Sequence, residues 1–260
     1  MLFFARPIGA DYDYQDYYPY LADFDHARFE WEIGIRRPKL ARQLALIRRM
    51  MPQAVTLLDV GAGPGYLCAV AKEQGFEPLG IEPSSAARLA GEQQFSVAYT
   101  ELDEVADKSL DVITCHHVLE HIEWPAKFLQ ALRTKLRPGG LLVLHVPHQQ
   151  PLSFLLREKL RIGQPDTFCT LYYPIHINGF TARSLGNLVE RASFRVVSLA
   201  NASMWSVHYD PFFLANYFRN GRSHALGAVK VAKHAARCAV DVLGNTFGRG
   251  DWVIGHFRAG

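Results

Sequence analysis

Apolar and polar positions along the first two thirds of the chain follow two periods, one typical of buried strands and one typical of helices. Short apolar runs predict strands at 55–60, 78–82, 95–99, 110–115 and 141–146. Stretches with apolar residues on a single stripe predict helices at 38–51, 65–74, from Ser84 onwards and at 124–136. Since strands and helices alternate, the pattern predicts a parallel sheet covered by helices on both faces.

The last third of the chain continues this pattern less regularly. Thr181 can cap a helix, and strands at 194–199 and 251–257 bring the candidates to seven. The segment between these two strands is longer than a simple connection, and it predicts helices near 210–219 and 224–243. We therefore expect a main domain over 38–260 with a helical insertion at about 206–250. An extension at 1–37 precedes it, whose tyrosines at 12–20 either pack on the main domain or form a flap over a ligand.

Composition and charge exclude several classes of protein. Apolar residues make up 49% of the chain, which is enough for a sizeable core. The 28 Lys and Arg nearly balance the 25 Asp and Glu, so a nucleic-acid partner is not expected. No apolar run is long enough to cross a membrane, and the first residues lack the basic leader of a signal peptide. The four scattered cysteines form no disulfide framework, so we expect a reducing cytoplasm.

The most informative segment is a glycine-rich loop between a strand and a helix, with the sequence Asp59-Val60-Gly61-Ala62-Gly63-Pro64-Gly65. Glycines allow a tight turn and let a ligand approach the backbone. Glu82 ends the next strand, where a carboxylate can accept hydrogen bonds from a ribose diol. The dinucleotide-binding motif of oxidoreductases needs a glycine where this chain has Tyr66, so an oxidoreductase is disfavoured. A P-loop is also disfavoured, because no Gly-Lys-Ser/Thr follows the glycines.

The loop resembles motif I of the class I S-adenosylmethionine-dependent methyltransferases, and further segments resemble the same family. These segments are Asp111–His121, Leu136–Val143, His176–Thr181 and Ala192–Phe194. The resemblance is to the small-molecule branch, methyltransferase types 11 and 23, and covers roughly residues 38–200 and the last strand. It implies S-adenosylmethionine as cofactor and a doubly wound, Rossmann-like sheet of seven mostly parallel strands, with an antiparallel last strand.

The resemblance also implies which residues hold the cofactor, since loops after parallel strands meet at one edge of a sheet. In the glycine-rich loop, the methionine portion is expected to contact Asp59, Gly61, Ala62, Gly63 and Gly65. Glu82, followed by Pro83, is expected at the ribose, and Glu101 and Leu102 beside the adenine. Cys115 and His116 are expected to line the reactive end.

Histidines near this edge are the candidates for catalysis. A methyl sulfonium must be held in line with the acceptor, and a base near neutral pH often removes the acceptor's proton. The candidate residues are His117, His121, Glu120, His148 and His176. We expect His117 or His121 to be the base, with Glu120 orienting either ring. The alternative is that Glu120 and His121 only stabilise the turn.

The same segment raises the question of a metal. His117-x-x-Glu120-His121 matches the H-x-x-E-H pattern of zinc proteases, but the methyltransferase pattern already explains it. Some quinone-type O-methyltransferases carry E-x-x-E-H here and bind a divalent metal with the carboxylates. His117 replaces the first Glu in this chain, so no metal is expected.

The acceptor is the least defined part of the prediction. The [D/N]-P-P-[Y/F] motif of nucleic-acid amino-methyltransferases is replaced by Cys115-His116-His117-Val118. We therefore expect a small-molecule acceptor, a sugar or a natural-product scaffold, methylated at O or N. The alternative is an inactive scaffold that only binds the cofactor. The apolar stripe at 226–243 packs on its own domain or on the partner of a homodimer, or forms a lid or a membrane-surface helix.

Overall fold

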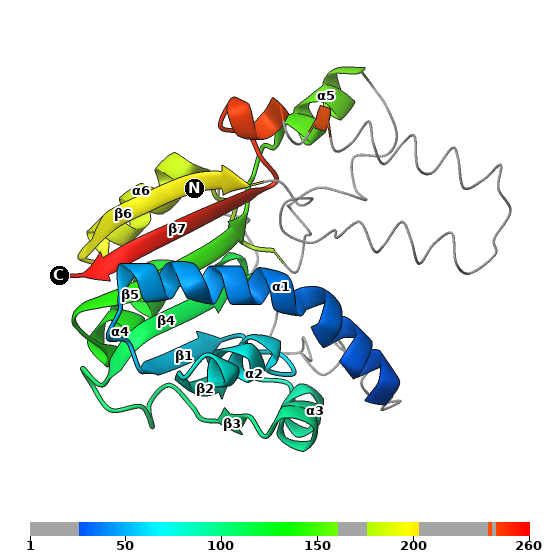
Figure 1. Ribbon diagram of the computed structural model, residues 1–260. Coiled ribbons are helices and arrows are strands. Elements are labelled where there is room, and N and C mark those ends of the chain that lie inside the picture. The colour runs from blue at the N-terminus through cyan, green and yellow to red at the C-terminus, as the bar shows by residue number, and fades with distance from the viewer. Residues whose placement is uncertain (1–25, 161–175, 203–238, 241–242) are drawn as a thin grey trace, which may run out of the picture.

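The computed structural model describes residues 26–160, 176–202, 239–240 and 243–260, and its centre is a seven-stranded sheet (Figure 1). The strands are β1 (Thr56–Val60), β2 (Glu77–Ile81), β3 (Ala98–Tyr99), β4 (Leu110–His116), β5 (Leu136–Pro147), β6 (Phe194–Ala202) and β7 (Trp252–Ala259). They lie in the order β3-β2-β1-β4-β5-β7-β6. Only the pairs that include β7 are antiparallel. The expected fold class is therefore confirmed.

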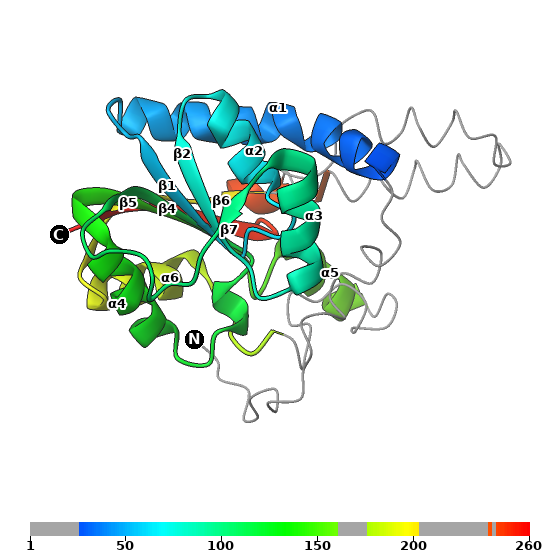
Figure 2. The ribbon, with the colours of Figure 1, turned by 90° about the horizontal axis from the view of Figure 1, so that it is seen from below.

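Helices cover both faces of the sheet. They are α1 (His26–Met50), α2 (Tyr66–Glu73), α3 (Ser85–Phe95), the short η3 (Leu119–His121), α4 (Pro125–Lys135), α5 (Leu152–Leu160) and α6 (Ala182–Arg191). Figure 2 shows α1 and α2 on one side of the sheet and α4 and α6 on the other. Neighbouring residues of β1 divide between the faces, because Leu57 packs with the α1–α3 core and Leu58 with the α4–α6 core. Such alternation is the period of a strand buried on both faces.

The first helix differs from the expectation. It begins at His26, so the predicted start at Pro38 is wrong, and α1 crosses the boundary expected between 37 and 38. The division into an extension and a main domain stays a prediction. Pro38 lies inside the helix and is exposed, at the loss of one backbone hydrogen bond. Burial of Ile33, Leu44 and Ile47 supplies the packing that holds the helix on both sides of the proline.

The fifth strand also begins earlier than expected, at Leu136 and not after the glycine pair. Pro138, Gly139 and Gly140 lie within it, as an irregularity in its pairing with β4. Leu136 pairs with Leu110, whereas the next paired residue of β4, Val112, faces Leu141. Gly139 has a positive φ of 75°, a conformation that lets β5 accommodate its extra residues as a bulge opposite β4.

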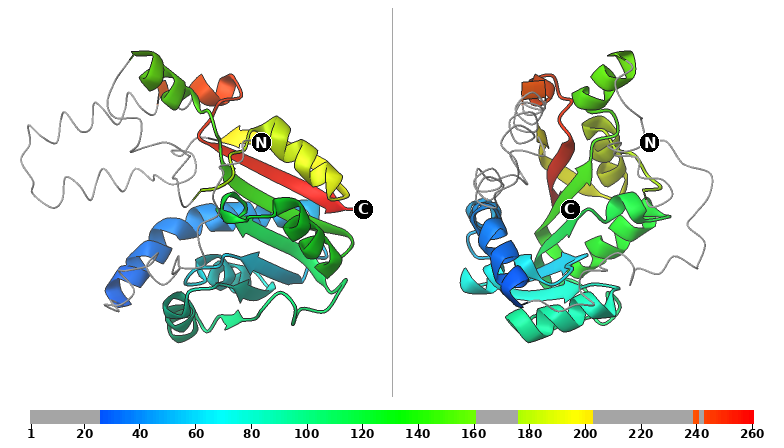
Figure 3. Two further views of the ribbon diagram at one scale, coloured as in Figure 1. Left: turned by 180° about the vertical axis from the view of Figure 1, so that it is seen from behind. Right: turned by 90° about the vertical axis from the view of Figure 1, so that its right-hand side faces the viewer.

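The carboxyl end of β5 leads into a small helical layer. In both views of Figure 3, α5 lies beside the short helix at 243–246. A backbone hydrogen bond of 2.9 Å from Leu152 to Arg249 joins these segments. The helix predicted at 210–219, most of the one at 224–243 and the tyrosines at 12–20 lie outside the described residues. Within the described part of the chain, no helix is both long and apolar enough to cross a membrane.

Candidate functional site

The glycine-rich loop lies at the carboxyl edge of the sheet, between β2 and β4. Backbone N–H groups of Gly61 and Ala62 donate to the Ile81 carbonyl at 2.8 and 3.0 Å, which holds the loop against the end of β2. On the other side, a Cβ on Gly61 would lie 2.3 Å from Cγ2 of Val118, so no larger residue fits there. The loop is therefore fixed between two strand ends, as the sequence predicts.

Conformation explains why the loop needs its other glycines. Gly63 and Gly65 have φ angles of 54° and 78°, in the left-handed region that glycine adopts at little cost. The hydroxyl of Tyr99 donates to the Gly63 carbonyl at 2.9 Å and fixes the turn. Gly65 is the N-cap of α2 and offers no side-chain cap, and a helix N-terminus of this kind favours an anionic ligand group.

Glu82 connects this loop to the end of β2. Its side chain is 5% exposed, and its two carboxylate oxygens accept hydrogen bonds from the backbone N–H groups of Gly63 at 2.8 Å and Ser84 at 2.9 Å. Burial raises the pKa of Glu82, while these two hydrogen bonds and the charge of Arg88 oppose the shift. Each carboxylate oxygen has a second lone pair, so the group can still accept hydrogen bonds from a diol.

Asp59 is buried and makes its hydrogen bond within the sheet. It is 4% exposed, and its Oδ1 accepts a hydrogen bond of 2.7 Å from Thr114 of β4. Burial raises the pKa of Asp59 to about 7, with the Thr114 hydrogen bond opposing and the Glu82 charge adding to the shift. The side chain therefore ties β1 to β4 behind the loop, and direct contact with a cofactor stays a prediction.

The remaining predicted cofactor residues lie along the same edge with different exposures. Glu101 is exposed and pairs with Arg88 of α3 at 3.1 Å, and Leu102 is half-buried after β3. Pro83 is exposed, while Ala62 is buried within the loop. The side chain of Cys115 belongs to the α4–α6 core and is fully buried, so only its backbone faces the edge.

Next to the loop, aromatic rings gather at the ends of β4 and β5 and the start of β7. The ring of His117 lies 4.2 Å from Trp252 and 4.7 Å from His145, measured between centroids. His116 reaches toward α1, where its Nε2 lies 2.7 Å from Nε2 of Gln43. Sequence reasoning missed His145 and Trp252, although a histidine within the apolar run of β5 is a signal that could have found the first.

His117 has an unusual backbone and an altered basicity. Its φ is 56°, uncommon for a residue with a side chain, and its Nδ1 lies 3.3 Å from Oε1 of Glu120. Burial lowers the pKa of His117 to about 3, and the positive charge of Lys39 on α1 adds to the shift. The ring is therefore neutral near pH 7, and a rate profile governed by it would change near pH 3, not near pH 6–7.

A second cluster forms where η3 meets the segment before α6. Ligand-type atoms of Glu120, His121 and His176 all lie within 4.8 Å of one another. The backbone N–H groups of Ile177 and Asn178 both donate to the Glu120 carbonyl, at 2.9 and 3.0 Å. Three of the five predicted catalytic residues are thus brought together, and His117 contacts the first of them.

His148 makes other contacts. Its ring Nδ1 accepts a hydrogen bond of 3.1 Å from the backbone N–H of Gln150. The backbone N–H of His148 donates to the Asp251 carbonyl at 2.8 Å. Burial lowers the pKa of His148 to about 4. These contacts account for the residue as a support of the β5 end, and its catalytic role stays a prediction.

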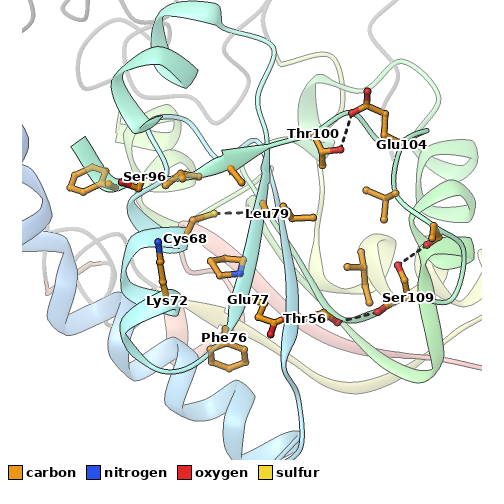
Figure 4. A pocket seen from close by; sticks show the side chains of 17 residues that line it. Thr56, Cys68, Lys72, Phe76, Glu77, Leu79, Ser96, Thr100, Glu104 and Ser109 are labelled. Atoms are coloured by element: carbon orange, nitrogen blue, oxygen red, sulfur yellow. Dashed lines mark hydrogen bonds between the residues drawn. The ribbon is translucent and has the colours of Figure 1, made fainter. Parts of the chain in front are cut away.

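A cavity of about 560 Å³ is lined by residues of α2, β2 and β3 and by residues at the starts of β1 and β4 (Figure 4). Figure 4 shows Cys68, Lys72, Glu77 and Glu104 among its side chains. None of the residues that line this cavity is one of the predicted site residues. We place the functional site at the carboxyl edge because the glycine loop, the buried carboxylates and the imidazoles converge there.

Together, the sheet order and the glycine loop followed by an acid on β2 define a class I S-adenosylmethionine-dependent methyltransferase fold. The chain belongs to the methyltransferase domain family, whose pattern matches residues 26–199. The protein is thus an S-adenosylmethionine-dependent methyltransferase.

Comparison with individual proteins agrees with this assignment. The ubiquinone biosynthesis O-methyltransferase of Aeromonas salmonicida is 31% identical over 64% of this chain and 71% of its own length. A thiol S-methyltransferase of Rattus norvegicus is 30% identical over 55% of this chain and 64% of its own length. Several other ubiquinone biosynthesis O-methyltransferases match over less than half of their own length.

Solved structures show the same fold. A crystal structure of an S-adenosylmethionine-dependent methyltransferase from Archaeoglobus fulgidus superposes with a TM-score of 0.56 at 18% identity. The match covers 89% of this chain and 99% of that chain. At this identity the likeness establishes the fold alone.

Proposed function

We propose that the protein transfers the methyl group of S-adenosylmethionine to an oxygen or nitrogen of a small molecule bound over the carboxyl edge of β4 and β5. The observation that carries this proposal is the contact between Glu82 and the glycine loop, 2.8 Å from Oε2 to the Gly63 nitrogen. This contact holds the buried carboxylate of Glu82 beside the glycine loop and the N-terminus of α2, which has no side-chain cap. A group that accepts hydrogen bonds from a ribose diol therefore lies next to a helix end that binds anions.

The residues fit the cofactor in three parts. The first N–H groups of α2 would bind the carboxylate of the methionine portion, and Glu82 would accept the ribose hydroxyls. Glu101 and Leu102 would lie beside the adenine. When bound, the cofactor supplies a sulfonium-activated methyl group, which needs an acceptor held in line more than it needs further activation.

The acceptor side is proposed at the imidazole-rich half of the edge. Rings of His117, His145 and Trp252 offer flat surfaces, and the Glu120–His121–His176 cluster lies next to His117. The likeness to relatives named as a ubiquinone biosynthesis O-methyltransferase and a thiol S-methyltransferase supports this acceptor class. We assign proton removal to this cluster, because the lowered pKa of His117 makes that ring a weak base.

Two measurements test the proposal. Calorimetry should show binding of S-adenosylmethionine and of its demethylated product; binding of NADH in their place would overturn the cofactor assignment. Radiolabelled S-adenosylmethionine is then incubated with the protein and a cell extract, which is afterwards separated by size. Label in the small-molecule fraction supports the proposal, label in protein or RNA contradicts it, and tight cofactor binding without transfer favours the inactive scaffold.

A further inference from the structure

A row of polar side chains on α1 runs beside the carboxyl edge of the sheet. The row consists of Arg36, Lys39 and Gln43, whose spacing of three and four residues places them on one side of a helix. At one end, Cζ of Arg36 lies 5.1 Å from the ring centroid of Tyr66, the first residue of α2. At the other end, Nε2 of Gln43 lies 2.7 Å from Nε2 of His116, the last residue of β4. Lys39 therefore lies between the N-terminus of α2 and the carboxyl end of β4.

Burial on the adjoining side of α1 holds this row in place. Leu44 and Ile47 are fully buried in the core that α1 shares with α2 and α3, and Ile33 is 2% exposed. A rotation of α1 that moved Lys39 away from the edge would expose these apolar side chains to water. Figure 1 shows the N-terminal half of α1 extending past the arrowhead of β1. The helix is thus positioned to form one wall of a site over the strand ends.

The surroundings of Lys39 disfavour its charge. The side chain is half-buried, and burial together with the charge of Arg36 lowers the pKa of Lys39 to about 7. The positive charge of Lys39 in turn contributes to the lowered pKa of His117, so the lysine lies within electrostatic reach of the ring that follows β4. An anion in contact with Lys39 would favour the charged form of the lysine and offset the cost of its burial.

We propose that Lys39 binds an oxyanion, either a carboxylate or a phosphate group, on the small molecule that accepts the methyl group. The inference rests on the proposed function, which puts the acceptor at the imidazole-rich half of the edge. An ammonium group offers three N–H donors, and its hydrogen bonds to an oxyanion are shorter and stronger than those between neutral groups. The rings of His117 and Trp252, 4.2 Å apart between centroids, offer flat surfaces to the rest of the molecule. The acceptor class thus narrows to small molecules that carry an acidic group.

Lys39 would act by position and not by proton transfer. An acceptor held at its acidic group keeps its reactive oxygen or nitrogen within a narrow range of positions, which is how binding raises the rate of a bimolecular step. That atom forms its bond to the methyl carbon while the carbon–sulfur bond breaks, which leaves S-adenosylhomocysteine. Its proton goes to the cluster of Glu120, His121 and His176, as proposed above, and the acidic group keeps its charge throughout. Lys39 is therefore a specificity-determining residue for the proposed reaction.

The first experiment needs no known acceptor. The full-length protein, with and without saturating S-adenosylhomocysteine, reacts with N-hydroxysuccinimidyl acetate while formate, benzoate or inorganic phosphate is titrated in. Peptide mass spectrometry measures the acetylation of Lys39 and of Lys159, an exposed control. An anion at about ten times its dissociation constant should slow acetylation of Lys39 roughly tenfold, because a bound ammonium does not react, and should leave Lys159 unchanged. Benzamide, the neutral counterpart of benzoate, should protect neither lysine.

The second experiment uses variants in the radiolabel assay. Lys39→Gln should lower the rate of transfer at limiting acceptor by about 10- to 100-fold, because glutamine loses the charge-assisted contact. Lys39→Arg keeps the charge and should recover most of the rate. Arg42→Gln, which changes an exposed residue about one turn further along α1, is the matched control and should transfer as the wild type. All three variants should bind S-adenosylhomocysteine with wild-type affinity, and mass spectrometry should find a carboxylate or phosphate in the labelled product.

The outcomes separate this proposal from the proposed function. Failure of all three anions to protect Lys39, or equal protection by benzamide, overturns the anion site. A labelled product without an acidic group or a wild-type rate in Lys39→Gln also overturns it, and so does weaker binding of S-adenosylhomocysteine by Lys39→Gln, which would put the lysine at the carboxylate of the cofactor. Thermal melting identifies a variant that fails to fold, in which case the protection experiment on the wild type decides. Protection of Lys39 by an anion in a protein that binds no cofactor would reject the proposed function and leave the anion site standing.

Discussion

Replacement of Glu82 by glutamine tests the cofactor site with the smallest change of shape. In the native protein the two carboxylate oxygens accept from Gly63 and Ser84 within a side chain that is 5% exposed. Glutamine has one acceptor oxygen, so its amide group must face one of these N–H donors. A buried N–H left without an acceptor costs about 1–3 kcal/mol, and we expect the free energy of unfolding to fall by that amount.

Cofactor affinity should fall as well. Hydrogen bonds to an ionised carboxylate contribute about 1.5–3 kcal/mol, and the ribose hydroxyls would lose this acceptor. That energy corresponds to an affinity roughly 10- to 150-fold weaker. Calorimetry with S-adenosylhomocysteine measures the affinity, and urea unfolding measures the stability.

The matched control is Glu77→Gln, at the amino end of the same strand, where the side chain is exposed. We expect it to change stability by less than about 0.5 kcal/mol and to leave the affinity unchanged. If Glu82→Gln folds and binds S-adenosylhomocysteine as tightly as the wild type, the ribose assignment is wrong. Equal losses in both variants would show that the effect is not local to Glu82.

Two further predictions concern the loop and the acid behind it. Gly65→Ala should lower the free energy of unfolding by about 1–3 kcal/mol, because φ is 78° and the new Cβ would lie 2.6 Å from Cγ2 of Val97. Urea unfolding measures this loss. The control is Gly75→Ala, where φ is a similar 77° but nothing lies within 4 Å of the new Cβ, so the difference between the two variants is the cost of the steric contact. The raised pKa of Asp59, about 7 in place of 3.8, means that unfolding releases a proton between these values, so stability falls as the pH rises through that window. Asp59→Asn should therefore reduce this slope by up to about 1.4 kcal/mol per pH unit, and parallel wild-type and variant curves from pH 4.5 to 6.5 would contradict the shift.

Local patterns were sufficient to predict that seven strands and a glycine-rich loop exist, but not where β3 and β5 begin. The run from Val55 to Val60 and the three glycines after it need only nearby residues to define a strand, a turn and a helix start. Elements whose boundaries depend on distant packing were not predicted. Pro38 has the properties of a first-turn residue, but α1 extends before it because Ile33 is buried in the core that α1 shares with α2 and α3.

The same limit applies to the candidate site. The histidines of the β4 edge could be found from their place after a strand, and so could Glu82. Their pairing could not, because the contact of Glu120 with His176 depends on two backbone hydrogen bonds to the segment before α6. Burial likewise has no local signature, so the lowered pKa of His117 was not foreseen.

The edge of the sheet divides into an acidic half and an imidazole half, and this division bears on how the reaction gains its rate. Asp59 and Glu82 are buried at the ends of β1 and β2, where the proposal puts the part of the cofactor that does not react. A carboxylate beside the sulfonium would stabilise the charged cofactor more than a transition state in which that charge is fading, and so would raise the barrier. At the ends of β4 and β5, His117 is neutral near pH 7 and its neighbours are aromatic. If the cofactor binds as proposed, the acids at β1 and β2 would serve its binding, and positioning of the acceptor at the imidazole half would be the main source of rate.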